Sequence, residues 1–284
     1  MSLDLADLAA RYRRDGFVHA RGLLPRAEVE ALAAFVDEAV ARRKAHDTRG
    51  LDEKTPYEQS FIQCQYLWED FPEVGGLTFH QTLGAALGAL LGADKVRLWH
   101  DQALYKEPGG RETEAHQDHA YWPIAEDDTV TAWMPLCPVD DATGCMGYVP
   151  GSHRADLQFV DIFRTPGAGA DLMQRQTAAA VYVPAQPGDV LFHHGRTIHM
   201  ARANRTDRMR RAYTAIYLKD GCTRSTDRPH PSVDRDAIPV GGRIDGGATP
   251  VVWPLRDGER PRPAPWPQTD SERVRAIRRL GIIP

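Results

Sequence analysis

Residues 96–136, VRLWHDQALYKEPGGRETEAHQDHAYWPIAEDDTVTAWMPL, contain two runs rich in branched and aromatic side chains, Val96–Tyr105 and Thr129–Leu136. Such runs favour strands, and the Pro108-Gly-Gly cluster after the first run favours a turn. Shorter runs of the same kind follow, each near a Gly, Pro or Asp cluster: Tyr148–Val149, Ala180–Val183, Val190–His194 and Ala212–Leu218. Many short strands between turn signals are typical of a β-sandwich or barrel.

The residues before position 96 follow a helical pattern. Apolar side chains recur at helical spacing in residues 4–14, from Pro25 to about Val40, and in residues 81–91, where Gly92 ends the pattern. A strand-like run, Gly16–Ala20, separates the first two helices. In the second helix we expect these residues to face inward: Val29, Leu32, Phe35 and Val36.

Helices first and strands later predict one domain over residues 1–284. Its parts would be a helical layer at about 1–95, a β-rich core at about 96–219 and a loop-rich C-terminal wrap at 220–284. Within the wrap we expect a last helix near residues 270–279.

The composition narrows the class of protein. The 284 residues are 42% hydrophobic and 26% charged, and the formal net charge of −4 gives no sign of binding to nucleic acid or an anionic membrane. No run approaches the ~18 apolar residues that span a bilayer, and the N-terminus lacks the pattern of a signal peptide. The four cysteines are scattered without a Cys-x-x-Cys pair. We therefore expect neither a disulfide framework nor a structural zinc site, and a cytoplasmic location.

The residues suited to chemistry are concentrated in Glu114-Ala-His116-Gln-Asp118-His119. On a strand, residues i and i+2 face the same side, so His116 and Asp118 would project together. An imidazole nitrogen beside a carboxylate oxygen provides two of the three ligands in the 2-His-1-carboxylate sites of non-haem iron(II) oxygenases. A His-x-Asp pair alone is expected about once by chance at this composition. A second histidine from elsewhere in the chain must complete the site.

That histidine has a candidate downstream. Pro187–Gly195 is typical of a turn into a strand, and another strand begins around His199. Arg210 follows His199 by eleven residues, which fits one strand, a hairpin turn at Asn204–Asp207 and a return strand. The return would place an arginine beside the metal, where it could bind the distal carboxylate of a 2-oxo diacid. Spacing alone leaves Arg210 and Arg211 open, because neighbours on a strand face opposite sides.

Together these segments resemble the phytanoyl-CoA dioxygenase family. The resemblance rests on His116-Gln-Asp-His-Ala-Tyr-Trp-Pro, Thr131-Ala-Trp-Met-Pro-Leu and Asp140-Asp-Ala-Thr-Gly-Cys-Met-Gly-Tyr-Val-Pro-Gly-Ser-His153. It continues with Pro187-Gly-Asp-Val, His199 and Asn204-Arg-Thr-Asp-Arg-Met-Arg210, and it includes the N-terminal RDGFV and GLLP. It covers roughly residues 10–218.

The resemblance implies a fold, an activity and cofactors. The fold would be a double-stranded β-helix, a jelly-roll or cupin-like core, with an N-terminal helical layer. The activity would be that of an Fe(II)- and 2-oxoglutarate-dependent dioxygenase that uses O2 and releases succinate and CO2, most often hydroxylating an unactivated C–H bond. Halogenating members replace the carboxylate ligand with a small residue, so Asp118 disfavours halogenation. Desaturation, epimerisation and ring formation use the same ligands and stay open.

Carried over residue by residue, the resemblance implies that His116, Asp118 and His199 bind the catalytic iron. It favours Arg210 over Arg211 as the residue that binds the C5 carboxylate of 2-oxoglutarate. Gln102, on the strand before the first ligand, fits a polar cosubstrate contact. Trp133 matches an aromatic residue of the cosubstrate pocket, and an ordinary core tryptophan is an equal interpretation.

Other residues have weaker claims. His119, Tyr121 and Trp122 could line a substrate pocket or form a partly exposed aromatic loop. His193 and His194 alternate faces, so at most one could point inward, and we do not expect either to be a ligand. Two further features read as loop elements: His153 in a turn, and segment 155–178 as either a mobile lid or a surface insertion.

Two other functions compete with the oxygenase. His116-x-Asp118-His119 resembles half of a dinuclear zinc hydrolase motif, but Glu114 stands where that motif needs its first histidine. A non-catalytic jelly-roll binding protein is the other alternative. For the oxygenase we expect a small-molecule substrate, either an acyl-CoA or, because no CoA-phosphate cluster is evident, a polar metabolite or natural-product intermediate. The chain would act as a monomer or homodimer.

Overall fold

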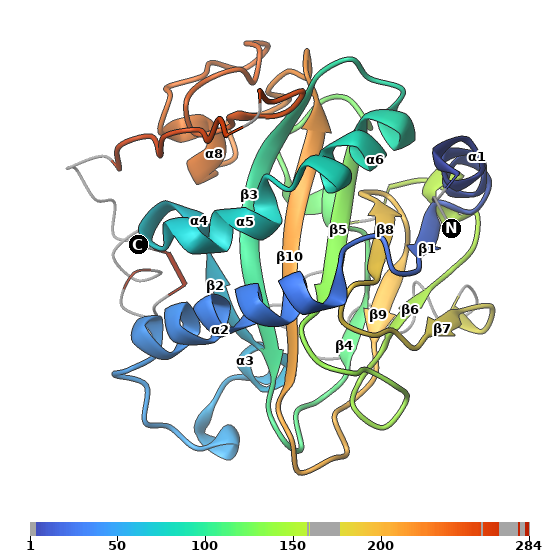
Figure 1. Ribbon diagram of the computed structural model, residues 1–284, viewed down its shortest axis with the longest axis vertical. Coiled ribbons are helices and arrows are strands. Elements are labelled where there is room, and N and C mark those ends of the chain that lie inside the picture. Colours follow the sequence, from blue (N-terminus) through green and yellow to red (C-terminus); the bar gives the residue numbers. More distant parts are fainter. Residues whose placement is uncertain are drawn as a thin grey trace.

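Two antiparallel sheets build the core of the computed structural model, which describes residues 4–157, 159, 177–256, 258–266, 278 and 282–283 (Figure 1). In this described part, the larger sheet has the strand order β1 (Phe17–Ala20), β8 (Val190–His194), β5 (Thr129–Pro135), β10 (Arg210–Lys219), β3 (Val96–Lys106) and β11 (Val251–Trp253), and β2 (Ile62–Gln65) also pairs with β3. The smaller sheet has the order β4 (Thr113–His116), β9 (His199–Ala201), β6 (Met146–Tyr148) and β7 (Val181–Val183). The fold is mainly β with a jelly-roll core and flanking helices, so the predicted fold class is confirmed.

The larger sheet has one face toward a cavity and one toward the helices. On β10 the cavity face holds Arg210, Thr214 and Ile216, while Tyr213 and Tyr217 belong to the hydrophobic core on the other face. The neighbouring strands alternate in the same way because the side-chain period of a strand is two. Their cavity-facing residues are His100, Gln102, Leu104, Thr131, Trp133 and His193.

Helices cover the other face of the larger sheet. Figure 1 shows α2 (Arg26–Arg43), α5 (Gly75–Thr78) and α6 (Gln81–Leu91) crossing it, with α1 (Leu5–Asp15) beside β1. Shorter helical elements connect them: η1 (Leu51–Glu53), α3 (Pro56–Ser60), α4 (Leu67–Asp70) and η2 (Pro72–Val74). The three predicted helices are therefore present. Among the described residues no single helix is long and apolar enough to cross a membrane, although the bent pair Pro72–Thr78 and Gln81–Leu91 together satisfies both conditions.

Local sequence explains where these helices begin and end. Asp4 caps α1 by accepting hydrogen bonds from the backbone N–H groups of Ala6 and Asp7, and Gly16 ends it with a positive φ of 79°. In α2 the expected inward position of Phe35 is wrong, because its side chain is 41% exposed. Val29, Ala33 and Val36 make the buried stripe instead, and Phe35 falls outside it.

The C-terminal region contributes residues to the wall of the cavity. It contains α8 (Pro231–Asp234) and β11, and the carbonyl of Ile282 accepts a hydrogen bond from the backbone N–H of Gln65 at 2.6 Å. Most of the predicted last helix near residues 270–279 lies outside the described residues, as does most of segment 155–178. The strand predicted at Tyr148–Val149 runs over Met146–Tyr148, and β2 and β11 were not predicted.

Candidate metal and cosubstrate site

His116 and His199 lie opposite each other on neighbouring strands. They are register partners in the β4–β9 pair, and their ring centres are 4.2 Å apart. Asp118 is not on the same strand, so that part of the sequence prediction is wrong: β4 ends at His116 and Asp118 begins the 3-10 turn η3 (Asp118–Tyr121). The backbone N–H of His119 donates to the carbonyl of Gly195 at 2.8 Å, which ties this turn to the segment after β8. The turn still brings the Asp118 carboxylate to both imidazoles.

Backbone hydrogen bonds fix the orientation of the two imidazoles. The Nδ1–H of His116 donates to the Glu114 carbonyl at 2.7 Å, and the Nδ1–H of His199 donates to the Thr197 carbonyl at 3.0 Å. Because a carbonyl oxygen only accepts, the hydrogen sits on Nδ1 and leaves Nε2 to present its lone pair. These Nε2 atoms lie 3.4 and 3.6 Å from Oδ1 of Asp118.

The electrostatics favour the protonation states that bind a metal. Burial, with help from nearby His116, holds the pKa of His199 well below its ordinary value, so this imidazole is neutral. Burial alone would raise the pKa of Asp118, but the neighbouring histidines outweigh it and hold that pKa well below its ordinary value. A neutral imidazole and an ionised carboxylate are the forms in which these groups coordinate a metal.

These three side chains form a cluster that fits a metal ion. One ligand atom from each of His116, Asp118 and His199 lies within 4.8 Å of the other two. The donor set is the 2-His-1-carboxylate set of non-haem iron(II). The cluster opens into a cavity of about 1060 Å³, which is large enough for a cosubstrate and a drug-sized second molecule.

Arg210 lies in the same cavity and is 2% exposed. Its guanidinium is 5.5 Å from the centre of the Trp133 ring, and its Nη1 donates to the Leu104 carbonyl at 3.4 Å. Burial lowers its pKa to about 10. Among the described residues its Nε has no hydrogen-bond partner, and neither has the buried Thr214 Oγ1 in the same cavity. A cavity that holds both a buried cation and an unpaired hydroxyl is a suitable place for a carboxylate.

Arg211 points to the opposite side of β10. One of its Nη atoms forms an ion pair with Asp37 of α2, and the other donates to the Leu136 carbonyl at 3.3 Å. Arg210 therefore lies in the cavity and Arg211 outside it.

Gln102 and Trp133 both face the cavity on either side of Thr214, which is the register partner of each. Gln102 accepts a hydrogen bond from Nε2 of Gln63 on β2 at 2.7 Å. Trp133 is 1% exposed, so it belongs both to the packed interior and to the cavity wall. Their cosubstrate roles stay predictions.

Comparison with known proteins agrees with this geometry. The family model for phytanoyl-CoA dioxygenase (PhyH) matches residues 12–212. The chain belongs to this family. Among curated relatives, a methylphosphonate hydroxylase from Gimesia maris is 25% identical over 73% of this chain and 78% of its own length. The human peroxisomal phytanoyl-CoA dioxygenase is 23% identical over 74% of this chain and 67% of its own length.

Solved structures extend the comparison beyond residue 212. The non-heme alpha ketoglutarate-dependent carbocyclase SnoK from nogalamycin biosynthesis is 31% identical, with a TM-score of 0.72 over 86% of this chain and 95% of its own. The epimerase SnoN from the same biosynthesis, solved with Fe3+, alpha ketoglutarate and nogalamycin RO, is 30% identical with a TM-score of 0.70 over 87% and 98%. This chain is accordingly a non-haem iron, 2-oxoglutarate-dependent dioxygenase.

In this PhyH family member, two further residues lie near the metal cluster. The sequence alone does not assign either of them to the metal cluster. Nε2 of His193 is 3.3 Å from Oδ2 of Asp118, and Oγ1 of Thr131 donates to the same oxygen at 3.1 Å. Side chains alternate between the two faces of a strand, so the sequence correctly predicted that at most one of His193 and His194 points inward. It could not tell which one. His194 lies behind the sheet face, next to Tyr12.

The remaining candidates separate into cavity residues and structural ones. Tyr121 and Trp122 line the cavity, whereas His119 is buried 3.7 Å from Asp127 and does not line it. His153 lies in the turn η4 (Ser152–Arg154) and its Nε2 bonds to the Arg13 carbonyl at 3.2 Å, as expected for a loop element.

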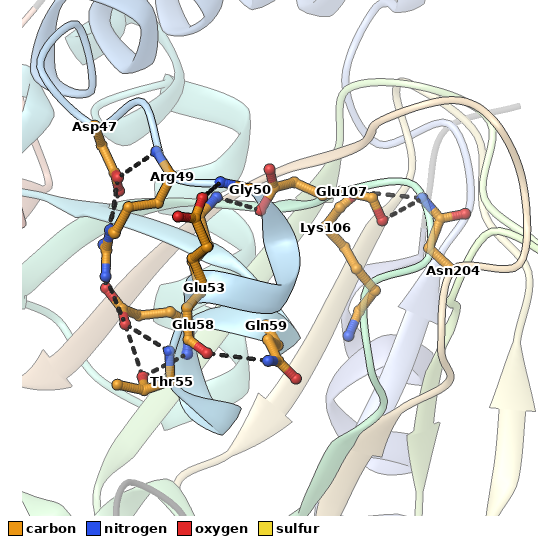
Figure 2. Close-up of polar contacts among 11 residues, drawn as sticks. Asp47, Arg49, Gly50, Glu53, Thr55, Glu58, Gln59, Lys106, Glu107 and Asn204 are labelled. Atoms are coloured by element: carbon orange, nitrogen blue, oxygen red, sulfur yellow. Dashed lines mark hydrogen bonds and ion pairs between the residues drawn. The ribbon is translucent and has the colours of Figure 1, made fainter.

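A polar network supports the rim of the cavity beside η1 and α3. Figure 2 shows Arg49 between Asp47 and Glu58, at 2.8 and 2.6 Å. Nearby, Lys54 pairs with Glu107 at 2.6 Å. Two cations of the rim, Arg49 and Lys54, are thus each neutralised by carboxylates of the same chain.

Proposed function

We propose that this oxygenase oxidises a small molecule at an unactivated C–H bond, normally by hydroxylation, while 2-oxoglutarate is converted to succinate and CO2. One observation supports it above others: a cluster of His116, Asp118 and His199 opens into the same large cavity as the buried Arg210. Iron and 2-oxoglutarate, when bound, would supply the oxidising power from O2. The chain supplies ligands, orientation and exclusion of water.

In this proposal His116, Asp118 and His199 hold iron(II), and Arg210 binds the C5 carboxylate of 2-oxoglutarate. The arginine can do so because it is buried and its Nε lacks a partner among the described residues. A carboxylate would satisfy that donor and offset the desolvated charge. Thr214 supplies a hydroxyl for the same group.

A ring-containing natural-product intermediate is the substrate class that we favour. Part of the cavity wall comes from residues outside the matched range 12–212, including Arg228, His230, Pro231, Arg235, Trp266 and Ile283. Aromatic rings at the wall, among them Trp122 and Trp266, suit flat or cyclic molecules. An acyl-CoA is less favoured because two of the cations that line the cavity, Arg49 and Lys54, are already paired with carboxylates.

Ring closure or epimerisation is the second candidate outcome. SnoK is named a carbocyclase and SnoN an epimerase. Their identities to this chain are nearly equal, at 31% and 30%, so similarity does not favour one reaction over the other. The metal cluster does not discriminate, because these reactions need the same ligands.

A dinuclear hydrolase is less favoured. Within the described ranges, one cluster of His, Cys, Asp or Glu side chains can hold a metal ion, and a second metal would have no comparable ligand set. Glu114 is not a member of that cluster.

The proposal is tested first without a substrate. Anaerobic addition of iron(II) and 2-oxoglutarate to the purified protein should give the weak visible charge-transfer band of the chelate. The band should disappear in the double variant His199→Ala, Asp118→Ala. A band that survives this double substitution would refute the ligand assignment.

The substrate is then sought by screening cyclic natural-product intermediates and acyl-CoAs for stimulated succinate formation. The product mass separates the outcomes: a gain of one oxygen indicates hydroxylation, a loss of two hydrogens indicates ring closure or desaturation, and no change indicates epimerisation. Stimulation by acyl-CoAs alone would refute the proposed substrate class.

A further inference from the structure

The two carboxylate oxygens of Asp118 have different surroundings. Oδ1 faces the Nε2 atoms of His116 and His199, at 3.4 and 3.6 Å. Oδ2 meets two other groups, Oγ1 of Thr131 at 3.1 Å and Nε2 of His193 at 3.3 Å. One oxygen is therefore on the metal side, and the other is held by the larger sheet.

The pair that holds Oδ2 is set by the register of two strands. Thr131 on β5 and His193 on β8 are direct register partners, and both face the cavity. Because they lie opposite each other, their polar atoms converge on one point. Both side chains are buried, with exposures of 2% and 1%. Replacing either hydrogen bond to Asp118 by one to water would therefore be costly.

The chemistry of Asp118 determines the direction of these bonds. An ionised carboxylate only accepts, so the Thr131 hydroxyl and the Nε2–H of His193 both donate. His193 consequently carries its hydrogen on Nε2, the reverse of His116 and His199, whose hydrogens are on Nδ1. With Nε2 so occupied, its lone pair is not available to a metal. Its Nδ1 has no partner among the described residues.

We propose that His193 and Thr131 are positioning residues that keep Asp118 a one-oxygen ligand of iron. The inference rests on the proposed iron site. Two donors on Oδ2 weaken its ability to coordinate, so that Oδ1 binds alone. A carboxylate that binds through both oxygens would take one of the three positions that the cosubstrate and O2 need. Through Asp118, the clamp formed by Thr131 and His193 keeps that position open.

A direct ligand role for His193 fits the structure less well. The set of ligand atoms within 4.8 Å of one another contains His116, Asp118 and His199, and His193 is not a member. Its ring is packed 4.3 Å from the His199 ring and 5.3 Å from the Tyr148 ring, which fixes it in its present orientation.

The test compares His193→Phe, which removes the donor but keeps a ring, with His193→Gln, which keeps an N–H donor. Thr131→Val removes the second donor with little change of shape. His194→Phe is the matched control, since His194 is the next residue and does not line the cavity. Thermal melting of the metal-free variants reports whether each folds.

The readouts are the anaerobic iron(II) dissociation constant, the iron–2-oxoglutarate charge-transfer band, and the visible spectrum of the Co(II)-substituted protein. We expect His193→Phe to weaken iron binding about 10–100-fold, as loss of a group supporting a ligand does. The charge-transfer band and the cobalt spectrum should shift as well. Thr131→Val should shift both spectra in the same direction, His193→Gln should restore them, and His194→Phe should leave all three unchanged.

The outcomes separate this inference from the function on which it rests. If the wild type forms the band and folded His193→Phe and Thr131→Val both match it, the clamp is refuted while the proposed iron site stands. Loss of a cobalt ligand in His193→Phe, with no effect of Thr131→Val and no rescue by Gln, would make His193 a ligand and also refute the clamp. A wild type that binds neither iron nor 2-oxoglutarate would refute the proposed function and the inference together.

Discussion

Arg210 and Arg211 are adjacent on β10 and lie on opposite sides of the larger sheet. Arg210 is buried in the cavity beside Trp133, while Arg211 pairs with Asp37 on the side covered by helices. The strand period of two separates two residues that look alike in sequence. Their separation makes Arg211 a natural control for Arg210.

We expect Arg210→Ala to weaken 2-oxoglutarate binding without weakening iron binding. Removing one partner of a buried charge pair costs about 2–5 kcal/mol, which corresponds to roughly a 30-fold loss of affinity or more. Titration of the charge-transfer band gives the 2-oxoglutarate constant, and anaerobic metal titration gives the iron constant. Arg211→Ala should leave both unchanged. An equal loss of cosubstrate affinity in the two variants would contradict the assignment.

Gly195 should be intolerant of a side chain because three groups pack against it. A Cβ atom there would lie 2.3 Å from Thr129 Oγ1 and 3.1 Å from the Trp122 ring. The Gly195 carbonyl also accepts the His119 N–H that holds the turn beginning at Asp118. We expect Gly195→Ala to lower the free energy of unfolding by about 1–3 kcal/mol and to weaken iron binding.

Denaturant unfolding and metal titration check this expectation. Gly247→Ala is the control, because the nearest atom to its Cβ is 3.5 Å away, an ordinary contact. Equal stability and iron affinity in both variants would show that the turn at Asp118 does not depend on a close approach at Gly195.

The sequence predicted the metal cluster better than the groups around it. The sequence could identify His116, Asp118 and His199 because the evidence for them lies along the chain. The first two form a short motif, and the separation of His199 from Arg210 fits a hairpin. Even there, the strand period placed Asp118 on a strand, although it begins a turn held by Gly195. A periodic pattern does not report a backbone hydrogen bond to a distant loop.

The support for Asp118 could not be predicted because it depends on the pairing of distant strands. Thr131 and His193 are 62 positions apart, and they meet because β5 and β8 pair in one register. The same limit applies to β2, whose short Ile-Gln-Cys-Gln run gives little strand signal, yet it places Gln63 against Gln102. The C-terminal cavity wall is likewise formed by packing and not by a motif.

Trp122 is expected to bind the substrate and not the cosubstrate. It lines the cavity directly after the turn that carries Asp118. Trp122→Ala should raise KM for whichever compound stimulates succinate formation, by about tenfold or more, since loss of a packed aromatic contact costs upwards of 1.4 kcal/mol. The half-saturating 2-oxoglutarate concentration should stay as in the wild type.

Phe35→Ala, on the exposed side of α2, is the control for Trp122→Ala. A parallel rise in the substrate KM and in the half-saturating 2-oxoglutarate concentration would instead mean that Trp122 supports the metal site.

Asp101 should make stability depend on pH. It lies on the helix side of β3, fully buried, where its Oδ2 accepts hydrogen bonds from the Tyr213 hydroxyl at 2.5 Å and the Trp68 backbone N–H at 3.0 Å. Burial outweighs these bonds and raises its pKa from 3.8 to about 7. Between these values the folded protein binds a proton that the unfolded chain releases. This contribution to the free energy of unfolding is therefore complete below about pH 4 and falls as the pH rises toward 7.

Urea unfolding of the wild type and Asp101→Asn across pH 4–8 measures this contribution. A full proton difference changes the free energy of unfolding by about 1.4 kcal/mol per pH unit. Asparagine cannot ionise, so the stability advantage of the wild type over the variant should shrink steadily from pH 4 to pH 7 and then level off. Other titrating groups affect both proteins alike and cancel in the difference. Parallel stability curves would mean that Asp101 is ionised in the fold, and that its hydrogen bonds from Tyr213 and Trp68 compensate for its burial.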